Sequence, residues 1–189
     1  MLRKLVSVAA CALAFTVAAP AAAQAASRTF ADGPGDVWTT EPQPSRVANR
    51  DQGDILRTTL SHRPHRVVVR TAFAELNREG RILVYTRLRT NTGKVFVVSQ
   101  IARSNHYQGR AVVAGGGGRR VDCAVGNTFD YATNVATVSV PRSCLGNPRT
   151  LQARFGVATG TARRGFADNP MNHRATNQLP PYTAPVRVG

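Results

Sequence analysis

The fold of this chain is decided by one stretch, Arg81-Ile-Leu-Val-Tyr-Thr-Arg-Leu-Arg-Thr90. Its residues fall into two alternating sets, Ile82, Val84, Thr86 and Leu88 against Arg81, Leu83, Tyr85, Arg87 and Arg89. Successive side chains of a β-strand point to opposite faces, so the first set can be buried while the second carries its charges into water. The stretch therefore predicts a strand with one face in a core.

Similar β-prone segments precede and follow this strand. The expected strands are 54–61, 66–74, 81–90, 94–102, 109–114, 120–125, 134–140 and 151–159. Turn residues such as Asn91-Thr-Gly93 separate them at intervals of about 8 to 12 residues, which is typical of antiparallel sandwiches and barrels. We expect an all-β, antiparallel β-sandwich with a jelly-roll or immunoglobulin-like layout. It should span 51–165, after a loop-like segment at 27–50 and before an extended tail at 166–189, which Tyr182 and Val186 lay against the domain.

The first 26 residues have the three parts of a secretory signal peptide. A cationic start, Met1-Leu-Arg-Lys4, precedes an apolar run at 5–17 that is too short for a membrane anchor. Pro20 and the small residues at 21–26 complete the pattern. Val8-Ala-Ala-Cys11 also resembles a lipobox, but the apolar residues before Cys11 are too few for a signal core. The sequence therefore predicts a secreted protein without a transmembrane segment in its mature form.

Two cysteines remain after such a leader, Cys123 and Cys144. An even number of cysteines in an exported chain favours a disulfide over a catalytic thiol or a metal pair, and neither residue lies in a CxxC motif. We expect residues 120–123 and 134–140 to be neighbouring strands. Pro141 should end the second strand, after which a turn would bring Cys144 back to Cys123.

The chain is strongly basic, with 25 lysines and arginines against 10 acids and a formal charge of +15. Such a charge attracts anionic partners: acidic envelope polymers, acidic glycans, lipid headgroups or extracellular nucleic acid. No signature of a specific nucleic-acid fold is present. The expected ligand-binding face is a basic, partly aromatic sheet surface made of Arg66, Arg70, Arg81, Tyr85, Arg87 and Arg89, because arginine forks suit carboxylates and tyrosine stacks on sugars. The alternative is a solvated surface, since the arginines are dispersed.

Half of the acids lie between Asp32 and Asp54. Calcium binds several hard oxygens on flexible loops, so we expect a candidate calcium site at Asp32, Asp36, Asp51 and Asp54. The spacing is not that of an EF-hand, and capping of turns by aspartate is the alternative. His62 and His65 have a spacing that zinc could use, but no third ligand is evident. Apart from calcium, the sequence indicates no cofactor.

The sequence contains no established catalytic motif. G-x-S-x-G, S-x-x-K and paired Cys–His signatures are absent. Ser104-Asn-His106 places a hydroxyl beside an imidazole, but triads are built in space. The glycine run at 115–118 lacks the spacing of a phosphate-binding loop and is interpreted as a hairpin loop. These observations favour a protein that is not an enzyme.

Two motifs carry a resemblance to a known group. Asp51-Gln-Gly-Asp-Ile55 precedes the first strand, and Val138-Ser-Val-Pro-Arg-Ser-Cys-Leu-Gly146 follows the cysteine-bearing Val121-Asp-Cys123. Over about half of its length the chain resembles poorly characterised secreted β-sandwich proteins of GC-rich, actinobacterial-type Gram-positive bacteria. These proteins are similar in layout to carbohydrate-binding modules. The resemblance implies a fold but no activity, and the aromatic sugar platforms are missing, since the one tryptophan, Trp38, lies in the N-terminal segment.

The expected function is that of a secreted, non-catalytic binding or envelope-associated module for an anionic or glycan ligand. One alternative is an exported hydrolase whose active site is assembled in space. Another alternative is a purely structural or interaction protein.

Overall fold

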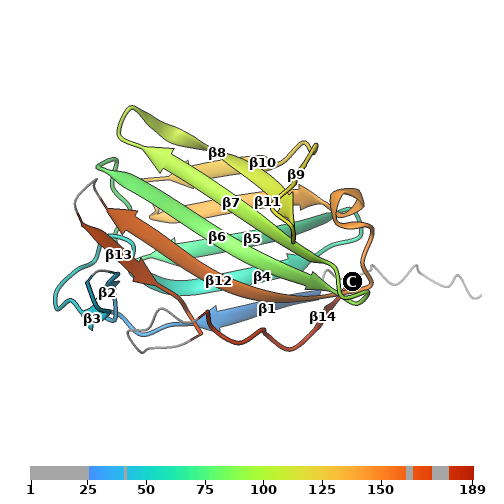
Figure 1. Cartoon of the computed structure of the whole chain (residues 1–189), viewed down its shortest axis with the longest axis horizontal. Coiled ribbons are helices and arrows are strands. Elements are labelled where there is room, and N and C mark those ends of the chain that lie inside the picture. The colour runs from blue at the N-terminus through green and yellow to red at the C-terminus, as the bar shows by residue number, and fades with distance from the viewer. Residues whose placement is uncertain (1–25, 41, 161–163, 172–178) are drawn as a thin grey trace, which may run out of the picture.

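The structure is a computed structural model that describes residues 26–40, 42–160, 164–171 and 179–189 (Figure 1). Residues 1–25 of the expected signal peptide, including Cys11, lie outside the described residues. In the described part of the chain, no helix has the length and apolar character needed to cross a membrane.

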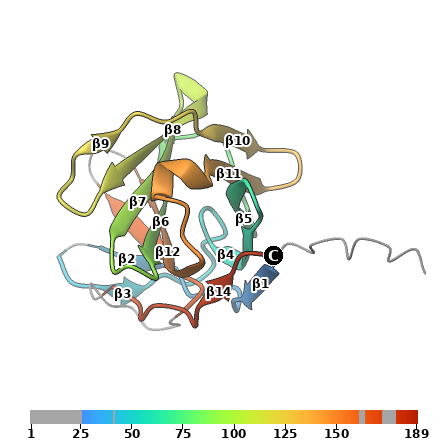
Figure 2. The same ribbon diagram turned by 90° about the vertical axis from the view of Figure 1, so that its right-hand side faces the viewer.

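The chain folds into two antiparallel β-sheets, which face each other as two layers (Figures 1 and 2). The five-stranded sheet has the order β1 (Ala26–Ala31), β4 (Ile55–His62), β5 (Arg66–Phe73), β11 (Val135–Pro141) and β10 (Gly126–Asp130). The nine-stranded sheet has the order β3 (Ser45–Arg46), β2 (Trp38–Thr39), β13 (Gly165–Asp168), β12 (Thr150–Gly160), β6 (Arg81–Thr90), β7 (Val95–Arg103), β8 (His106–Gly115) and β9 (Arg120–Val121), and β14 (Val186–Arg187) also pairs with β12. The prediction of an all-β, antiparallel fold is confirmed.

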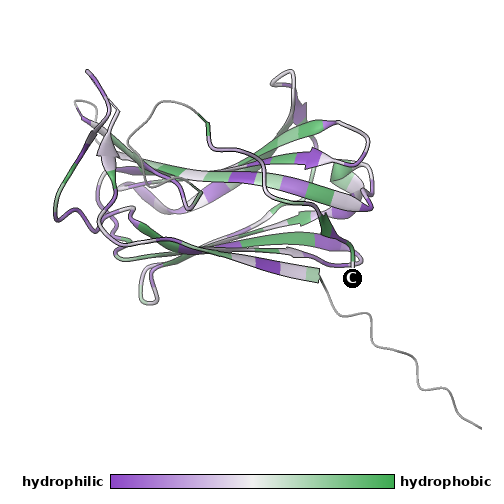
Figure 3. Ribbon diagram, turned by 90° about the horizontal axis from the view of Figure 1, so that it is seen from below, coloured by the Kyte–Doolittle hydropathy of each residue, from purple (hydrophilic) through white to green (hydrophobic). Residues whose placement is uncertain are grey.

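The strand that decided the fold behaves as its pattern predicts. Along β6, the side chains of Ile82, Val84, Thr86 and Leu88 are buried, whereas those on the other face are exposed or half-buried. Figure 3 shows the same alternation of hydrophobic and hydrophilic residues along other strands of both layers. The alternation therefore gives each sheet one apolar inner face, and the core forms between these two faces.

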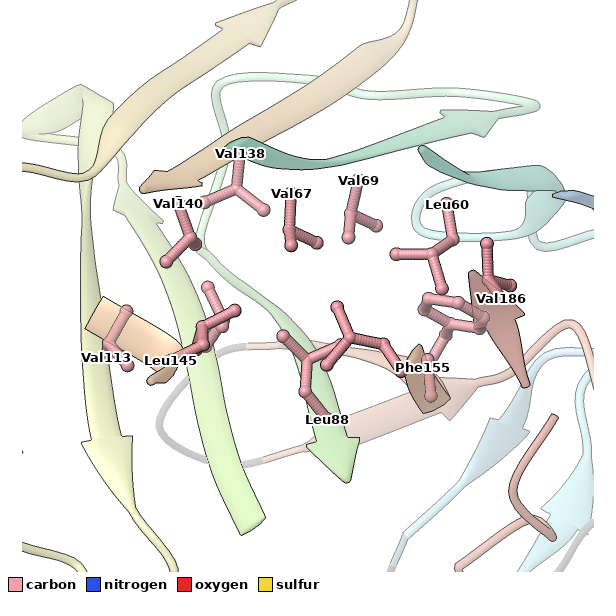
Figure 4. Close-up of a cluster of buried hydrophobic side chains, with 13 residues drawn as sticks. Leu60, Val67, Val69, Leu88, Val113, Val138, Val140, Leu145, Phe155 and Val186 are labelled. Carbon is pink, nitrogen blue, oxygen red and sulfur yellow. The ribbon is translucent and has the colours of Figure 1, made fainter. Parts of the chain in front are cut away.

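The core is a layer of aliphatic side chains around Phe155 (Figure 4). Leu60 of the five-stranded sheet and Leu88 of the nine-stranded sheet are fully buried in it, and Phe155 is 2% exposed. Burial of a leucine or phenylalanine side chain contributes about 1.5–3 kcal/mol, so this layer is the main force that holds the sheets together. Polar bonds also join the sheets. The buried amide of Gln100 in β7 donates to Asn127 Oδ1 at 2.9 Å and to the Thr137 carbonyl at 3.0 Å, in β10 and β11.

Two parts of the expected organisation differ from the structure. The segment 27–50, expected as a loop, contains β1, β2 and β3. β1 pairs with β4, β2 pairs with β13, and β3 pairs with β2. Residues 120–123 and 134–140 are not paired neighbours: β9 ends the nine-stranded sheet, and β11 pairs with β10 and β5 of the other sheet. The chain crosses from one sheet to the other between β9 and β10.

The tail also joins the fold. Val186 lies in the core and is 5% exposed. Its carbonyl oxygen is hydrogen-bonded to Nδ1 of the buried His62 at 3.2 Å. β13 and β14 pair with β12, so the sheet extends beyond residue 165.

Cys123 and Cys144 form a disulfide. Cys123 lies in the crossing between the two sheets, and Cys144 lies in the short 3-10 helix Arg142–Leu145 that follows β11. The bond therefore links the end of the nine-stranded sheet to the five-stranded sheet.

Replacement of both cysteines, Cys123→Ser with Cys144→Ser, should lower the free energy of unfolding by about 3 kcal/mol, because the unfolded chain regains the entropy of a closed loop. Urea unfolding of the mature protein measures this change. Reduction of the wild-type protein with a thiol should produce a similar shift. Unchanged urea midpoints in both experiments would contradict a structural role for the bond.

Candidate anion-binding face

The outer side of the nine-stranded sheet carries a concentration of arginines on β6 and β12. The ladder between these strands sets Arg87 opposite Arg154, Arg89 opposite Gln152 and Tyr85 opposite Gly156. We call the outward-facing residues of the two strands the arginine face: Arg81, Leu83, Tyr85, Arg87, Arg89, Gln152, Arg154, Gly156 and Ala158. The core residues Leu88 and Phe155 alternate with them and fix their positions.

Arg87 and Arg154 form a cross-strand pair of like charge. Residues directly opposite each other in an antiparallel sheet have Cβ atoms about 5 Å apart, and like charges there are destabilising. The strands β6, β7, β8 and β12 contain no acidic residue that could neutralise the pair. The Nε atoms of both side chains are buried and have no hydrogen-bond partner. Each guanidinium has therefore lost part of its hydration without gaining an acceptor, which costs free energy.

Tyr85 lies beside this pair. A Cβ atom placed on Gly156 would stand 2.3 Å from the Tyr85 hydroxyl oxygen and 2.7 Å from the ring atom Cε1, so the ring reaches across the backbone of β12 where no side chain is present. A tyrosine hydroxyl is protonated at neutral pH and can donate a hydrogen bond, and burial raises the pKa of Tyr85 further.

The C-terminal segment holds two of the arginines in place. The Tyr182 ring centroid lies 3.9 Å from the guanidinium carbon of Arg154 and 4.2 Å from that of Arg89, which are distances of cation–π contacts. Arg89 Nε also donates to Gln152 Oε1 at 3.0 Å, and Gln152 Nε2 donates to the Thr183 carbonyl. The arginine face is therefore ordered by a segment that lies far from β6 in the sequence.

The expected face of six residues is not one surface. Arg81, Tyr85, Arg87 and Arg89 lie on β6, but Arg66 and Arg70 lie on β5, in the other sheet. There Arg66 donates to the Ser139 hydroxyl and carbonyl. The prediction placed consecutive strands side by side, whereas the chain changes sheet between β5 and β6. Arg154, Gln152 and Tyr182 were missed, and the alternation of polar and apolar residues from Thr150 to Phe155 is the signal that could have indicated Arg154.

Three acidic residues gather where β13, the neighbour of β12, meets β4 of the other sheet. One carboxylate oxygen each from Asp32, Asp36 and Asp168 lies within 4.8 Å of the others. Asp54 is fully buried nearby, and its Oδ2 accepts a hydrogen bond from the Gly35 backbone N–H at 2.7 Å. Asp51 is exposed and lies outside this group. The calcium site stays a prediction. Asp168 is an additional candidate ligand, which the sequence did not indicate because Asp168 lies far along the chain from Asp32 and Asp36.

Asp168 also links the two sheets. Its Oδ2 accepts the Ile55 backbone N–H of β4 at 2.6 Å, and its Oδ1 accepts the Asn169 N–H at 2.7 Å. Burial raises the pKa of Asp168 to about 8, and the charges of Asp32 and Asp36 act in the same direction, although the two backbone donors oppose them.

The remaining candidates do not form a common site. His62 is fully buried against the tail, whereas His65 is exposed in the β4–β5 turn. Ser104 and His106 are exposed at the β7–β8 turn. The glycines at 115–118 form the β8–β9 turn, in which the Gly118 N–H donates to the Gly115 carbonyl, as expected for a hairpin loop.

Comparisons with known proteins give no relative for this arrangement: no protein-family model, curated protein or solved structure matches the chain.

The titration of Asp168 should be visible in the pH dependence of stability. Between its ordinary pKa of 3.8 and the folded value of about 8, the folded state holds a proton that the unfolded state releases. Asp168 therefore makes the free energy of unfolding fall as the pH rises from about 4 to about 8. Asp168→Asn should remove this contribution. The free energy of unfolding of the variant should therefore rise relative to that of the wild type as the pH approaches 8.

Urea unfolding at pH 5, 6.5 and 8, in the presence of a chelator, measures the effect as the difference between variant and wild type. The pKa of the buried His62 is lowered, so this residue makes the free energy of unfolding rise with pH. The contribution is the same in the variant and the wild type and cancels in their difference. Asp130→Asn is the matched control, because the Asp130 carboxylate is exposed and caps a turn. Equal pH slopes in Asp168→Asn and the wild type would be the contrary result.

Proposed function

We propose that the mature chain is an exported, non-catalytic β-sandwich module that binds an acidic glycan of a cell envelope on its arginine face. The observation that carries the proposal is the pair Arg87 and Arg154, directly opposed, with both Nε atoms buried and unpartnered. An anion placed between the two guanidinium groups would offset their repulsion and supply the acceptors that the protein does not provide.

The composition of the arginine face favours a carboxylate-bearing sugar polymer over a small ion. Guanidinium groups bind carboxylates through two parallel hydrogen bonds, and the Tyr85 ring offers an apolar surface and a hydroxyl donor beside them. The face follows β6, a strand of ten residues, and is therefore extended along one direction. The net charge of the whole chain is +15, of which Arg3 and Lys4 of the expected signal peptide carry +2, and the remaining +13 would draw such a polymer to the mature protein over a longer range.

Export is part of the proposal. It is supported by the signal-peptide pattern of the first 26 residues and by the disulfide, because such bonds form and persist in oxidising compartments. The resemblance to secreted β-sandwich proteins of actinobacterial type also supports export.

The two outer faces of the sandwich provide a matched test. Arg87→Gln with Arg154→Gln should weaken the binding of polygalacturonate about tenfold or more, because it removes the paired donors. Arg66→Gln with Arg70→Gln removes the same charge from the other sheet and should change the affinity much less. Isothermal titration at two salt concentrations measures both affinities and their salt dependence, with neutral dextran as the control ligand.

An equal loss in both double variants would show that net charge alone attracts the polymer and would contradict a specific face. Absence of wild-type binding at low salt would overturn the proposal in favour of a structural role. Turnover of ester, peptide or glycoside substrates, abolished by one Ser, His or acid substitution, would instead support the exported hydrolase.

A further inference from the structure

β6 begins and β12 ends on the left in Figure 1. A pocket of about 430 Å³ lies at this end of the sandwich. Three segments distant in sequence line it: the loop containing Arg50 and Gln52, the turn containing Asn77 and Gly80, and the β12–β13 region with Thr159 and Phe166. Its volume lies in the range of small-molecule sites, about 300–1,000 Å³.

The Arg50 side chain is held in this pocket by a phenyl ring, and not all of its N–H groups have a hydrogen-bond acceptor. Its guanidinium carbon lies 3.5 Å from the centroid of the Phe166 ring, and one terminal nitrogen donates weakly to Thr159 Oγ1 at 3.4 Å. Its Nε is buried and has no hydrogen-bond partner. Stacking on a ring holds a guanidinium plane in one orientation, so Arg50 is preorganised to bind a planar anion.

Two glycines allow the segments around the pocket to approach closely. A Cβ atom on Gly53 would lie 2.5 Å from Thr159 Cγ2, and one on Gly80 would lie 2.8 Å from the Gly160 carbonyl oxygen. Both glycines also have positive φ angles, of 80° and 68°, which other residues adopt only with strain. The three segments therefore approach more closely than side chains would permit.

Two side-chain amides and the Glu79 carboxylate stand beside the cation. Gln52 Oε1 accepts the Asn77 backbone N–H at 3.0 Å, which fixes the Gln52 amide. Asn77 Oδ1 accepts the backbone N–H of Glu79, whose side chain also lines the pocket, and Arg164 adds a second cation. Planar amides, a carboxylate and a stacked arginine together can bind several hydroxyl groups and one carboxylate.

We propose that this pocket binds a single sugar acid, with its carboxylate at Arg50 and Arg164 and its hydroxyl groups at Gln52, Asn77 and Glu79. The inference deepens the proposed function, on which it rests for the class of polymer. A neighbouring hollow lined by Arg81 and Leu83 shares Thr159 and Gly160 with the pocket, so the arginine face and the pocket are continuous. A glycan chain on the face can thus place one of its acidic units in the pocket.

Titration of the mature protein with galacturonic acid tests the pocket separately from the face. Arg50→Met keeps an aliphatic side chain over Phe166 but removes the charge, and it should weaken binding about tenfold or more. Arg28→Met is the matched control, because Arg28 also lies over a phenyl ring, that of Phe30, but at the exposed edge strand β1. Galactose, which lacks the carboxylate, and acetate, which lacks the hydroxyl groups, should both bind at least tenfold more weakly than galacturonic acid.

Arg164→Gln, at an exposed position, provides a second variant should Arg50→Met fail to fold, which thermal melting reports. Wild-type affinity in both Arg50→Met and Arg164→Gln, or equal affinity for galactose and galacturonic acid, overturns the inference. Loss of galacturonic acid binding in Arg87→Gln with Arg154→Gln also overturns it, because the ligand would then occupy the face. Binding of galacturonic acid without binding of polygalacturonate supports the pocket and rejects only the proposed polymer function.

Discussion

The antiparallel register between β6 and β12 is the interaction on which the rest of the structure depends. It runs without a break from the pair Thr90 and Leu151 to the pair Arg81 and Gly160. On its inner side it places Leu88 beside Ala153 in the core, and on its outer side it places Arg87 beside Arg154. A slip of one residue would exchange the two faces, burying arginines and exposing the core. Hydrophobic burial therefore maintains the register, and the register in turn brings two like charges together on the surface.

Charge is segregated by the fold. Asp32, Asp36, Asp54 and Asp168 lie together in or beside the buried region where the edges of the two sheets meet, and Asp168 connects those edges through the Ile55 N–H. The arginine face, in contrast, lies on strands that contain no acid. Arginines that are dispersed along the sequence thus come together across β6 and β12, next to a tyrosine and a pocket, although the outer face of the other sheet also carries exposed arginines on β4 and β5. This arrangement is the basis on which we propose an anionic ligand.

Sequence reasoning succeeded where the signal is local. The alternation in β6 predicted both its bounds and its buried side, and the two cysteines were paired correctly. It failed for contacts between distant segments. Arg66 and Arg70 were placed beside β6, although the chain changes sheet before it, and the proximity of Asp168 to Asp32 and Asp36 was not foreseen. The short strands β1, β2 and β3 were also missed, since two or six residues carry little alternation of their own, and β1 and β2 are defined by pairing with β4 and β13, which lie elsewhere in the sequence.

The sequence by itself determined the class of fold, the disulfide and the basic character of the surface, because residue alternation, cysteine number and charge are properties of the chain before it folds. The tertiary structure decided which strands share a sheet and therefore which arginines meet. Strand order depends on the packing of whole layers against each other, and that packing pairs β6 with β12 instead of with its predecessor β5. The Arg50 pocket arises in the same way, from three segments that have no contact until the sandwich closes.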